Sequence, residues 1–142
     1  MPHVVITGAS RGLGFCMARE FAGRGWMVTI SGRDGATLGT AVRELDSSGA
    51  GTVAYLVSDI SEEGEADRLW GFAAGRSPVD VWINNAGINQ RAGTLDTLPD
   101  ADMDRVVAVN LLGTMHGLAA AYRGMAAQGF GQIGRASCRE RV

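Results

Sequence analysis

Three glycines follow a short β-branched run near the start of the chain, and this arrangement could hold a phosphate group. Val4, Val5, Ile6 and Thr7 lead into Gly8, Gly12 and Gly14, after which a helical apolar pattern begins. A strand that turns tightly into a helix leaves N–H groups unpaired at the positive end of the helix dipole, which suits an anion. Glycine permits positive φ and close approach of a phosphate or a second strand. An ordinary glycine-rich connection is the alternative, because three glycines alone are a weak signal.

The elements that must position this turn alternate between strands and helices. We expect strands at residues 3–7, 26–31, 52–57 and 79–83, and helices at residues 12–24, 34–45, 61–74 and 100–128. Strands that are apolar at nearly every position are covered on both faces, and their alternation with helices favours a parallel sheet. The sequence therefore predicts an α/β fold of the Rossmann type. This fold is a doubly wound parallel sheet with the first strand central, truncated here after about four strands.

Four motifs follow one another in a specific order along this framework. They are Thr7-Gly8-Ala9-Ser10-Arg11-Gly12-Leu13-Gly14, then Asp59, then Asn84-Asn85-Ala86-Gly87, then Asn110. In this combination the chain resembles the short-chain dehydrogenase/reductase (SDR) family over about residues 3–132. The resemblance implies an NAD(P)-binding domain at residues 1–132, incomplete compared with the family. It also implies a reaction that moves hydride between a nicotinamide and a small carbonyl or alcohol substrate.

The resemblance also assigns roles to individual residues. The cofactor-binding residues it implies are Gly8, Ser10, Arg11, Gly12, Leu13 and Gly14 at the pyrophosphate, Asp59 and Ile60 at the adenine, and Asn85, Ala86 and Gly87 at the nicotinamide ribose. Asn110 would be the catalytic residue, belonging to a tetrad in which it holds a water of a proton relay. Alternatives stay open: Asp59 as a helix cap before Ser61, Asn110 as a solvent-facing residue, and Asn84 as a structural tie between strands.

The residues after the second strand favour one nicotinamide cofactor over the other. A carboxylate that holds the ribose 2′-hydroxyl of NAD(H) is usual about 20 residues beyond the first glycine. This chain has Ser31, Gly32 and Arg33 there, and Arg33 with Arg11 could clamp a 2′-phosphate through charge-assisted hydrogen bonds. We therefore predict NADP(H) rather than NAD(H). The alternative is a solvated Arg33, with Asp34 holding the ribose.

The chain departs from the family in the residues that carry the proton. All 13 basic residues are arginine, and four positions after Tyr55 and Tyr122 stand Asp59 and Ala126. Without a lysine, the Tyr-x-x-x-Lys arrangement that lowers the pKa of the tyrosine cannot form, and the family's serine lies further along. We therefore expect that the family to which the chain is similar makes its parent protein an oxidoreductase, and that these 142 residues alone are inactive. The alternative is a non-catalytic dinucleotide-binding sensor or scaffold.

Composition excludes several other classes of function. The net charge is −2 with no basic stripe, which argues against a nucleic-acid partner. No apolar run approaches the length of a membrane span, and the start of the chain does not read as a signal peptide. Cys16 and Cys138 have no metal-ligand spacing, so no metal is expected. We expect a cytoplasmic protein whose parent is a homo-oligomer.

The last ten residues read differently from the rest. Residues 133–142 have no apolar period of either kind and look like a translated sequencing adapter. We expect them to be a non-native tail outside the fold. The fourth strand would then be an open edge of the sheet.

Overall fold

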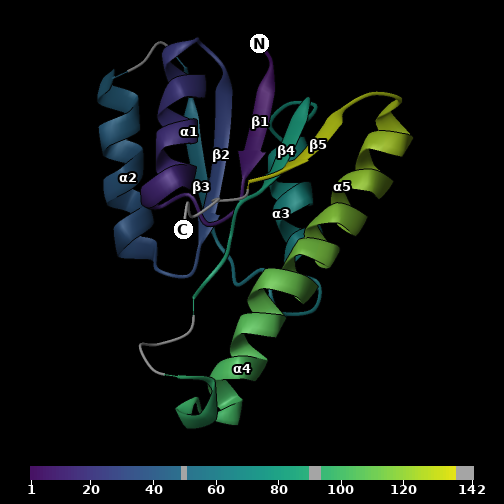
Figure 1. The fold of residues 1–142 in the computed structure, drawn as a ribbon. Helices are drawn as coiled ribbons and strands as arrows, with labels where there is room; N and C mark the ends of the chain where they lie inside the picture. The colour runs from purple at the N-terminus through teal and green to yellow at the C-terminus, as the bar shows by residue number, and fades with distance from the viewer. Residues whose placement is uncertain (49–50, 90–93, 137–142) are drawn as a thin grey trace.

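A five-stranded parallel sheet forms the middle of the molecule, in the order β3-β2-β1-β4-β5 (Figure 1). The computed structural model describes residues 1–48, 51–89 and 94–136. The strands are β1 (His3–Ile6), β2 (Met27–Gly32), β3 (Val53–Val57), β4 (Val81–Asn84) and β5 (Gln132–Arg135). The expected α/β fold, a doubly wound parallel sheet with the first strand in the middle, is confirmed.

Helices cover both faces of this sheet. Helices α1 (Gly12–Gly23) and α2 (Gly35–Ser48) lie together on one face, and α3 (Glu65–Ala74) and α5 (Gly113–Gln128) lie on the other (Figure 1). The connection after β4 contains a short 3-10 helix, η1 (Leu95–Thr97), and then α4 (Asp100–Val107). Each helix therefore carries the chain from the end of one parallel strand back to the start of the next.

The core has two halves, one on each side of the central strand. Val4 and Ile6 of β1 face the cluster under α1 and α2, and Val5 faces the cluster under α3 and α5. All three side chains are fully buried. Burial on both faces explains why the strand is apolar at successive positions instead of alternating.

The far edge of the sheet corrects two expectations. β5 pairs with β4 in register from Val81 opposite Gln132 to Asn84 opposite Arg135, so the sheet has five strands and β4 is not an open edge. Residues 133–135, expected outside the fold, belong to this strand. Residues 137–142 lie outside the described residues, and the non-native origin of residues 133–142 stays a prediction.

Helix boundaries also differ from the expected ones. α3 begins at Glu65 instead of residue 61, because residues 61–64 form turns in which Gly64 has a φ of 78°. α2 extends to Ser48, three residues beyond the expected end. Its start agrees with the sequence, since Asp34 Oδ1 accepts from the backbone N–H of Ala36 at 3.1 Å.

The helix expected at residues 100–128 is continuous but not regular. Between α4 and α5 the chain forms a π-helical segment, η2 (Ala108–Leu112). Such a segment holds one extra residue in a turn and re-aims the side chains around it. Asn110 lies in the middle of η2, so the irregularity falls on the asparagine that the sequence singled out.

Candidate cofactor-binding site

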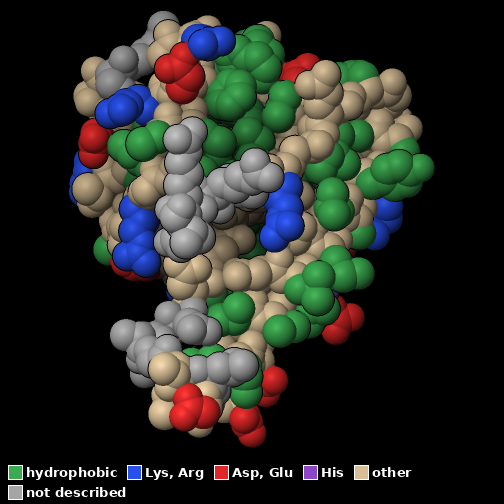
Figure 2. Space-filling view, in the orientation of Figure 1, with side chains coloured by type: hydrophobic (Ala, Val, Ile, Leu, Met, Phe, Trp, Pro, Cys, Tyr) green, Lys and Arg blue, Asp and Glu red, His purple; other side chains and the backbone are tan. Residues whose placement is uncertain are grey.

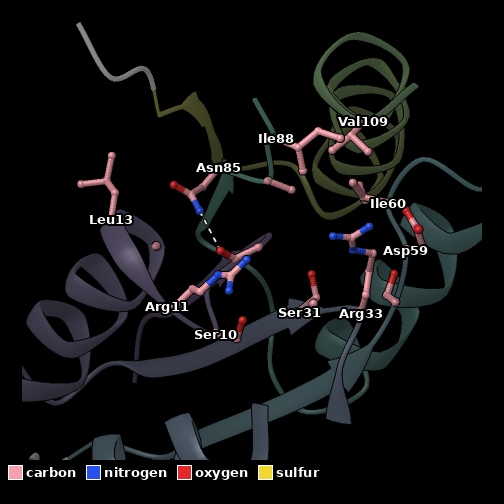
Figure 3. A pocket seen from close by; sticks show the side chains of 16 residues that line it. Ser10, Arg11, Leu13, Ser31, Arg33, Asp59, Ile60, Asn85, Ile88 and Val109 are labelled. Atoms are coloured by element: carbon pink, nitrogen blue, oxygen red, sulfur yellow. Dashed lines mark hydrogen bonds between the residues drawn. The ribbon is translucent and has the colours of Figure 1, made fainter. Parts of the chain in front are cut away.

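A crevice opens beyond the carboxyl ends of the central strands. Its first hollow has a volume of about 310 Å³ (Figure 3). A second hollow of about 390 Å³ adjoins it and shares Leu13 and residues 85–88. The first is lined by Gly8, Ser10, Arg11, Leu13, Gly14, Ser31, Gly32, Arg33, Ser58, Asp59, Ile60, Asn85, Ala86, Gly87, Ile88 and Val109. All the expected cofactor-binding residues except Gly12 are among these.

The remaining two expected residues lie close by. Asn110 lines the second hollow, together with Asn84 and Asn89. Gly12 is the exposed first residue of α1, between Arg11 and Leu13, with a φ of 61°, and it lines neither hollow. The structure therefore brings every expected residue except Gly12 to one crevice, and their roles stay predictions.

Close packing explains two of the glycines after β1, Gly8 in the turn and Gly14 in the first turn of α1. A Cβ on Gly8 would lie 2.7 Å from the Cα of Ala86, and Gly8 has a φ of 64°. A Cβ on Gly14 would lie 2.4 Å from the side-chain nitrogen of Asn85. Any side chain at either position would push the turn away from the segment after β4, so the glycines hold these two walls of the crevice together.

Thr7 and Asn85 join the same two walls by hydrogen bonds. Thr7 Oγ1 accepts from the backbone N–H groups of Asn85 and Ala86, both at 3.0 Å. Asn85 Nδ2 donates to the carbonyls of Thr7 at 2.9 Å and Gly8 at 3.0 Å. Because both N–H bonds of the Asn85 amide are used in this way, that side chain shapes the crevice as well as lining it.

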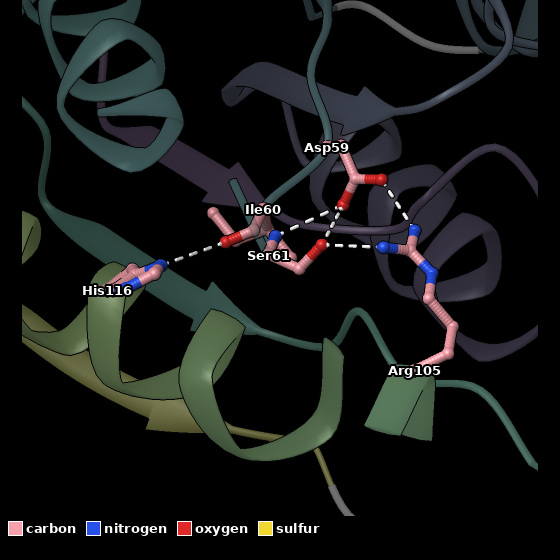
Figure 4. Close-up of polar contacts among 5 residues, drawn as sticks. All are labelled: Asp59, Ile60, Ser61, Arg105 and His116. Atoms are coloured by element: carbon pink, nitrogen blue, oxygen red, sulfur yellow. Dashed lines mark hydrogen bonds and ion pairs between the residues drawn. The ribbon is translucent and has the colours of Figure 1, made fainter. Parts of the chain in front are cut away.

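The carboxylate of Asp59 lies within a polar network at the end of β3 (Figure 4). Its Oδ1 accepts from the Ser61 backbone at 3.1 Å and from the Ser61 hydroxyl at 2.6 Å. Arg105 forms an ion pair with its Oδ2 at 2.5 Å. Burial raises the pKa of Asp59, but the bonds from Ser61 and Arg105 outweigh it and hold the pKa below its usual value. The alternative that Asp59 caps a helix is wrong, because α3 begins at Glu65 and its N-cap residue is Gly64, with no side-chain cap bond. Asp59 instead holds the turn at Ser61, and it lines the crevice.

The end of β2 presents arginine and serine to the crevice. Ser31 and Arg33 line it, and Arg33 is exposed (Figure 3). The neighbouring carboxylate is used elsewhere: Asp34 accepts from the Ala36 N–H and the Thr37 hydroxyl at the start of α2. These bonds, that from Thr37 first, lower the pKa of Asp34. Asp34 is not among the residues that line either hollow.

Asn110 holds the segment after β4 from the opposite side. Its Nδ2 donates to the carbonyl of Ile88, and its Oδ1 accepts from the N–H of Ile88, both at 2.8 Å. The Asn110 carbonyl accepts from the Thr114 hydroxyl at 2.8 Å. The half-buried side chain therefore uses both of its polar atoms on the backbone of Ile88 and is not a merely solvated surface group, as the alternative had it. Its catalytic role stays a prediction.

Asn84 does not tie two strands together through its side chain, because that side chain bonds Trp82 of the same strand and its buried Nδ2 has no partner among the described residues. Its side chain is 3% exposed, and its Oδ1 accepts from the Trp82 indole at 3.0 Å. A Cβ on Gly117 of α5 would lie 2.1 Å from that oxygen, so the helix packs directly on it. Asn84 thus fixes the distance between β4 and α5.

Sequence reasoning missed three residues that shape the crevice. Arg105 holds Asp59, Ile88 is held by Asn110, and the Thr7 hydroxyl joins the strands. Thr7 had a signal, since a hydroxyl that directly follows a buried strand is placed to accept backbone bonds. Arg105 had none, because an arginine on the polar side of a helix is typical of a solvated surface.

The described part of the chain contains no other obvious kind of site. Within residues 1–48, 51–89 and 94–136, no three histidine, cysteine or acidic side chains gather as metal ligands would. Over the same ranges, every helix falls short of the length and apolar character needed to span a membrane.

Comparison with known proteins now gives the family. The sequence profile described as "short chain dehydrogenase" matches residues 2–137. The chain belongs to the short-chain dehydrogenase family, as its four motifs indicated. It is 34% identical to the 2-(R)-hydroxypropyl-CoM dehydrogenase of Xanthobacter autotrophicus, over 91% of this chain and 53% of that protein.

Solved structures agree with this placement. A metagenomic short-chain oxidoreductase in complex with NADP is 31% identical, with a TM-score of 0.84, over 99% of this chain and 64% of that one. An NAD⁺-bound xylitol dehydrogenase is 23% identical, with a TM-score of 0.87, over 94% of this chain and 52% of that one, a likeness of fold alone. Family membership therefore implies a nicotinamide dinucleotide without saying which. The chain spans about half the length, or less, of the curated relatives it matches.

Proposed function

We propose that this chain is the cofactor-binding part of an NADP(H)-dependent oxidoreductase acting on the carbonyl or alcohol group of a small molecule. The observation that carries the proposal is the crevice itself. The glycine turn, Arg33, Asp59 and Asn85 come from four separate segments and line one hollow beyond the strands' carboxyl ends. In open α/β sheets, this is where nucleotides bind. The nicotinamide, when bound, supplies or accepts the hydride, and the residues that line the crevice would bind and orient it.

The choice of NADP(H) over NAD(H) has support from the charges at the end of β2. Arg11 and Arg33 line the hollow in which the ribose would lie, together with the hydroxyl-bearing Ser10 and Ser31. Asp34, the carboxylate that would hold a 2′-hydroxyl, instead accepts hydrogen bonds at the start of α2. Guanidinium groups bind phosphate through paired charge-assisted hydrogen bonds, which a 2′-hydroxyl cannot match.

A binding comparison tests this choice. Titrating the chain with NADPH and with NADH, followed by nicotinamide fluorescence, should show a preference for NADPH. Replacing Arg33 with alanine should weaken NADPH binding about tenfold or more, as expected for a lost charge-assisted hydrogen bond, and leave NADH within about twofold. Arg43→Ala is the control, because Arg43 donates to the Thr40 hydroxyl on the solvent-exposed side of α2 and does not line the crevice. An unchanged preference for NADPH in Arg33→Ala would contradict the clamp.

A second candidate is a dinucleotide-binding sensor or scaffold, which the composition of the chain favours. The given sequence has no lysine, and neither tyrosine has one four positions on. We propose that the chain as given binds dinucleotide without turnover. Incubation with NADPH and a panel of ketones and aldehydes, at concentrations that saturate binding, should leave the NADPH absorbance unchanged. If the gene's reading frame continues into Ser and Tyr-x-x-x-Lys, the longer protein is the enzyme; if it does not, the sensor is favoured.

The remaining expectations concern partners and compartment. An apolar stripe runs along η2 and α5, where Leu111, Met115, Leu118 and Tyr122 are between 43 and 70% exposed (Figure 2). This stripe supports the proposal that the parent is a homo-oligomer, since large exposed apolar patches mark interaction surfaces. The net charge of −2, with no basic stripe, supports the proposal that the protein binds no nucleic acid, and the cytoplasmic location and the absence of a membrane partner stay predictions.

A further inference from the structure

Arg105 contacts the segment that follows the carboxyl end of β3. It stands on α4, and its two terminal nitrogens contact neighbouring acceptors: Nη2 lies 2.5 Å from Asp59 Oδ2 and Nη1 lies 2.9 Å from Ser61 Oγ (Figure 4). The side chains of Arg105 and Asp59 are only 34% and 26% exposed. A partly shielded, two-pronged contact of this kind is more rigid than the exposed ion pairs of ordinary helix surfaces.

The network fixes the direction of every hydrogen in it. Because Arg105 can only donate, the Ser61 oxygen accepts from it and must turn its own hydrogen toward Asp59. A carboxylate has about four acceptor positions. Ser61 uses both on Oδ1, through its N–H at 3.1 Å and its hydroxyl at 2.6 Å, and Arg105 uses one on Oδ2. One acceptor position on Oδ2 is left, on a residue that lines the crevice.

The helix that carries Arg105 is itself held in place. Five positions further on, the Asn110 side chain accepts from the N–H of Ile88 and donates to its carbonyl, with both hydrogen bonds at 2.8 Å. On α5, His116 Nδ1 lies 3.3 Å from the carbonyl of Ile60 (Figure 4). The segment at residues 59–61 is therefore tied to the same continuous helix at two points, which restrains the position of the Asp59 carboxylate.

We propose that Arg105 is a positioning residue that gives the site its selectivity for the base of the dinucleotide. By fixing Asp59 as an ionised carboxylate with a single open acceptor position, it makes the crevice accept a base with a 6-amino group and reject one with a 6-oxo group. An amino group donates to the open position, whereas an oxo group would place its lone pairs against a negative charge. The inference rests on the proposed function, because it places the adenine beside Asp59.

The experiment compares two probes that differ at this one atom. NADPH and its hypoxanthine analogue, in which an oxo group replaces the 6-amino group, are titrated against the full chain, and the ratio of their dissociation constants is the readout. The same pair without the 2′-phosphate is run in parallel, so the result does not depend on the choice between NADP(H) and NAD(H). We expect the chain to prefer the adenine form by about tenfold or more, the scale of one hydrogen bond to a charged group.

Two substitutions of Arg105 are compared with a matched control. Arg105→Gln removes the charge, and Arg105→Lys keeps it but cannot bridge Asp59 and Ser61 with a fixed fork. Each should lower the preference at least threefold, with the lysine variant between the wild type and the glutamine variant. Arg123→Gln is the control, because Arg123 of α5 pairs with Asp67 of α3 at 2.7 Å on the open surface, with both side chains about 60% exposed. It should leave the ratio unchanged.

Each outcome bears on the inference in a defined way. If a folded Arg105 variant binds both probes more weakly but keeps the wild-type ratio, Arg105 is only structural and the inference is overturned. If the wild type binds both probes equally, the inference is overturned while the dinucleotide site stands. If the wild type binds no dinucleotide, the proposed function fails and this inference fails with it. A circular dichroism spectrum of each variant identifies any that does not fold, and the remaining Arg105 variant then decides.

Discussion

The two ends of β1 both carry buried polar side chains, but they are built for different purposes. At the amino end, His3 is fully buried: Nε2 lies 2.8 Å from the Thr29 hydroxyl and Nδ1 lies 3.1 Å from the Ser77 carbonyl. The backbone N–H of His3 donates to Asp80 at 2.7 Å. These groups satisfy one another, and His3 lines neither of the two hollows of the crevice.

At the carboxyl end, Thr7 is 1% exposed and equally well bonded, yet the groups around it frame an opening. The side chains of Thr7 and Asn85 form hydrogen bonds with backbone groups. Other polar side chains, such as Ser10, Arg33 and Asp59, line the hollow. A cluster of buried polar residues is therefore not by itself a site. What distinguishes the carboxyl end is that donors and acceptors remain for something else to use.

The largest expected effect comes from filling the contact between the two walls. In Gly14→Ala, the new Cβ would lie 2.4 Å from Asn85 Nδ2 and 2.8 Å from the Cα of Ala9. We expect the free energy of unfolding in urea to fall by about 3 kcal/mol, as for severe overpacking, and dinucleotide binding to be lost. Gly23→Ala, on the same helix with open space around it, should change stability by no more than about 1 kcal/mol. Equal effects of the two substitutions would contradict the packing argument.

A smaller effect is expected from removing one oxygen at the carboxyl end. Thr7→Val keeps the shape of the side chain but leaves the N–H groups of Asn85 and Ala86 without their acceptor. The expected loss is about 2 kcal/mol in urea unfolding, with binding weakened because the crevice wall shifts. Thr40→Val removes an exposed hydroxyl that bonds the Ala36 carbonyl and should cost less than about 0.5 kcal/mol. A Thr7→Val protein as stable as Thr40→Val would show that the tie is not needed.

The smallest effect belongs to the amino end and depends on pH. Burial lowers the pKa of His3; the Ser77 hydrogen bond and nearby Asp80 oppose this only in part, and Arg76 adds to the lowering. The unfolded chain therefore takes up a proton at a higher pH than the folded one. The contribution of the neutral, buried His3 to the free energy of unfolding should be complete above about pH 6.5 and should be lost as the pH drops from there toward the lowered pKa.

Urea unfolding at pH 7.5 and pH 5.5 measures this dependence, with His3→Gln as the comparison. The glutamine variant should be less stable at pH 7.5, with a smaller loss between the two pH values than the wild type. Its affinity for dinucleotide at pH 7.5 should equal that of the wild type, because the amino end takes no part in binding. Parallel pH dependence in the two proteins would show that His3 does not titrate with folding.

The sequence predicted the parts of this site that lie in short continuous motifs next to the expected strands. Gly8 and Asn85 lie just after buried strands, Gly14 lies in the first turn of the helix after β1, and parallel strands bring their carboxyl ends to one edge. Arg105 was not predictable, because its partner Asp59 is 46 positions away and only the packing of α4 brings them together. β5 was missed because residues 133–142 look like a translated sequencing adapter and were therefore expected outside the fold, although Gln132–Arg135 pairs with β4. The π-helical segment was missed because one extra residue barely changes an apolar pattern that helices on either side continue.

The walls of the crevice come from different connections between the parallel strands, with Gly8 in the first connection and Asn110 in the last. No partly assembled form of the chain can present the whole set at once, so a dinucleotide that binds here recognises only the finished molecule. Such a ligand is linked to folding: at a hundred times its dissociation constant it would add about 2.7 kcal/mol to the free energy of unfolding. The midpoint of denaturation is therefore a reporter of occupancy that needs no chemical turnover.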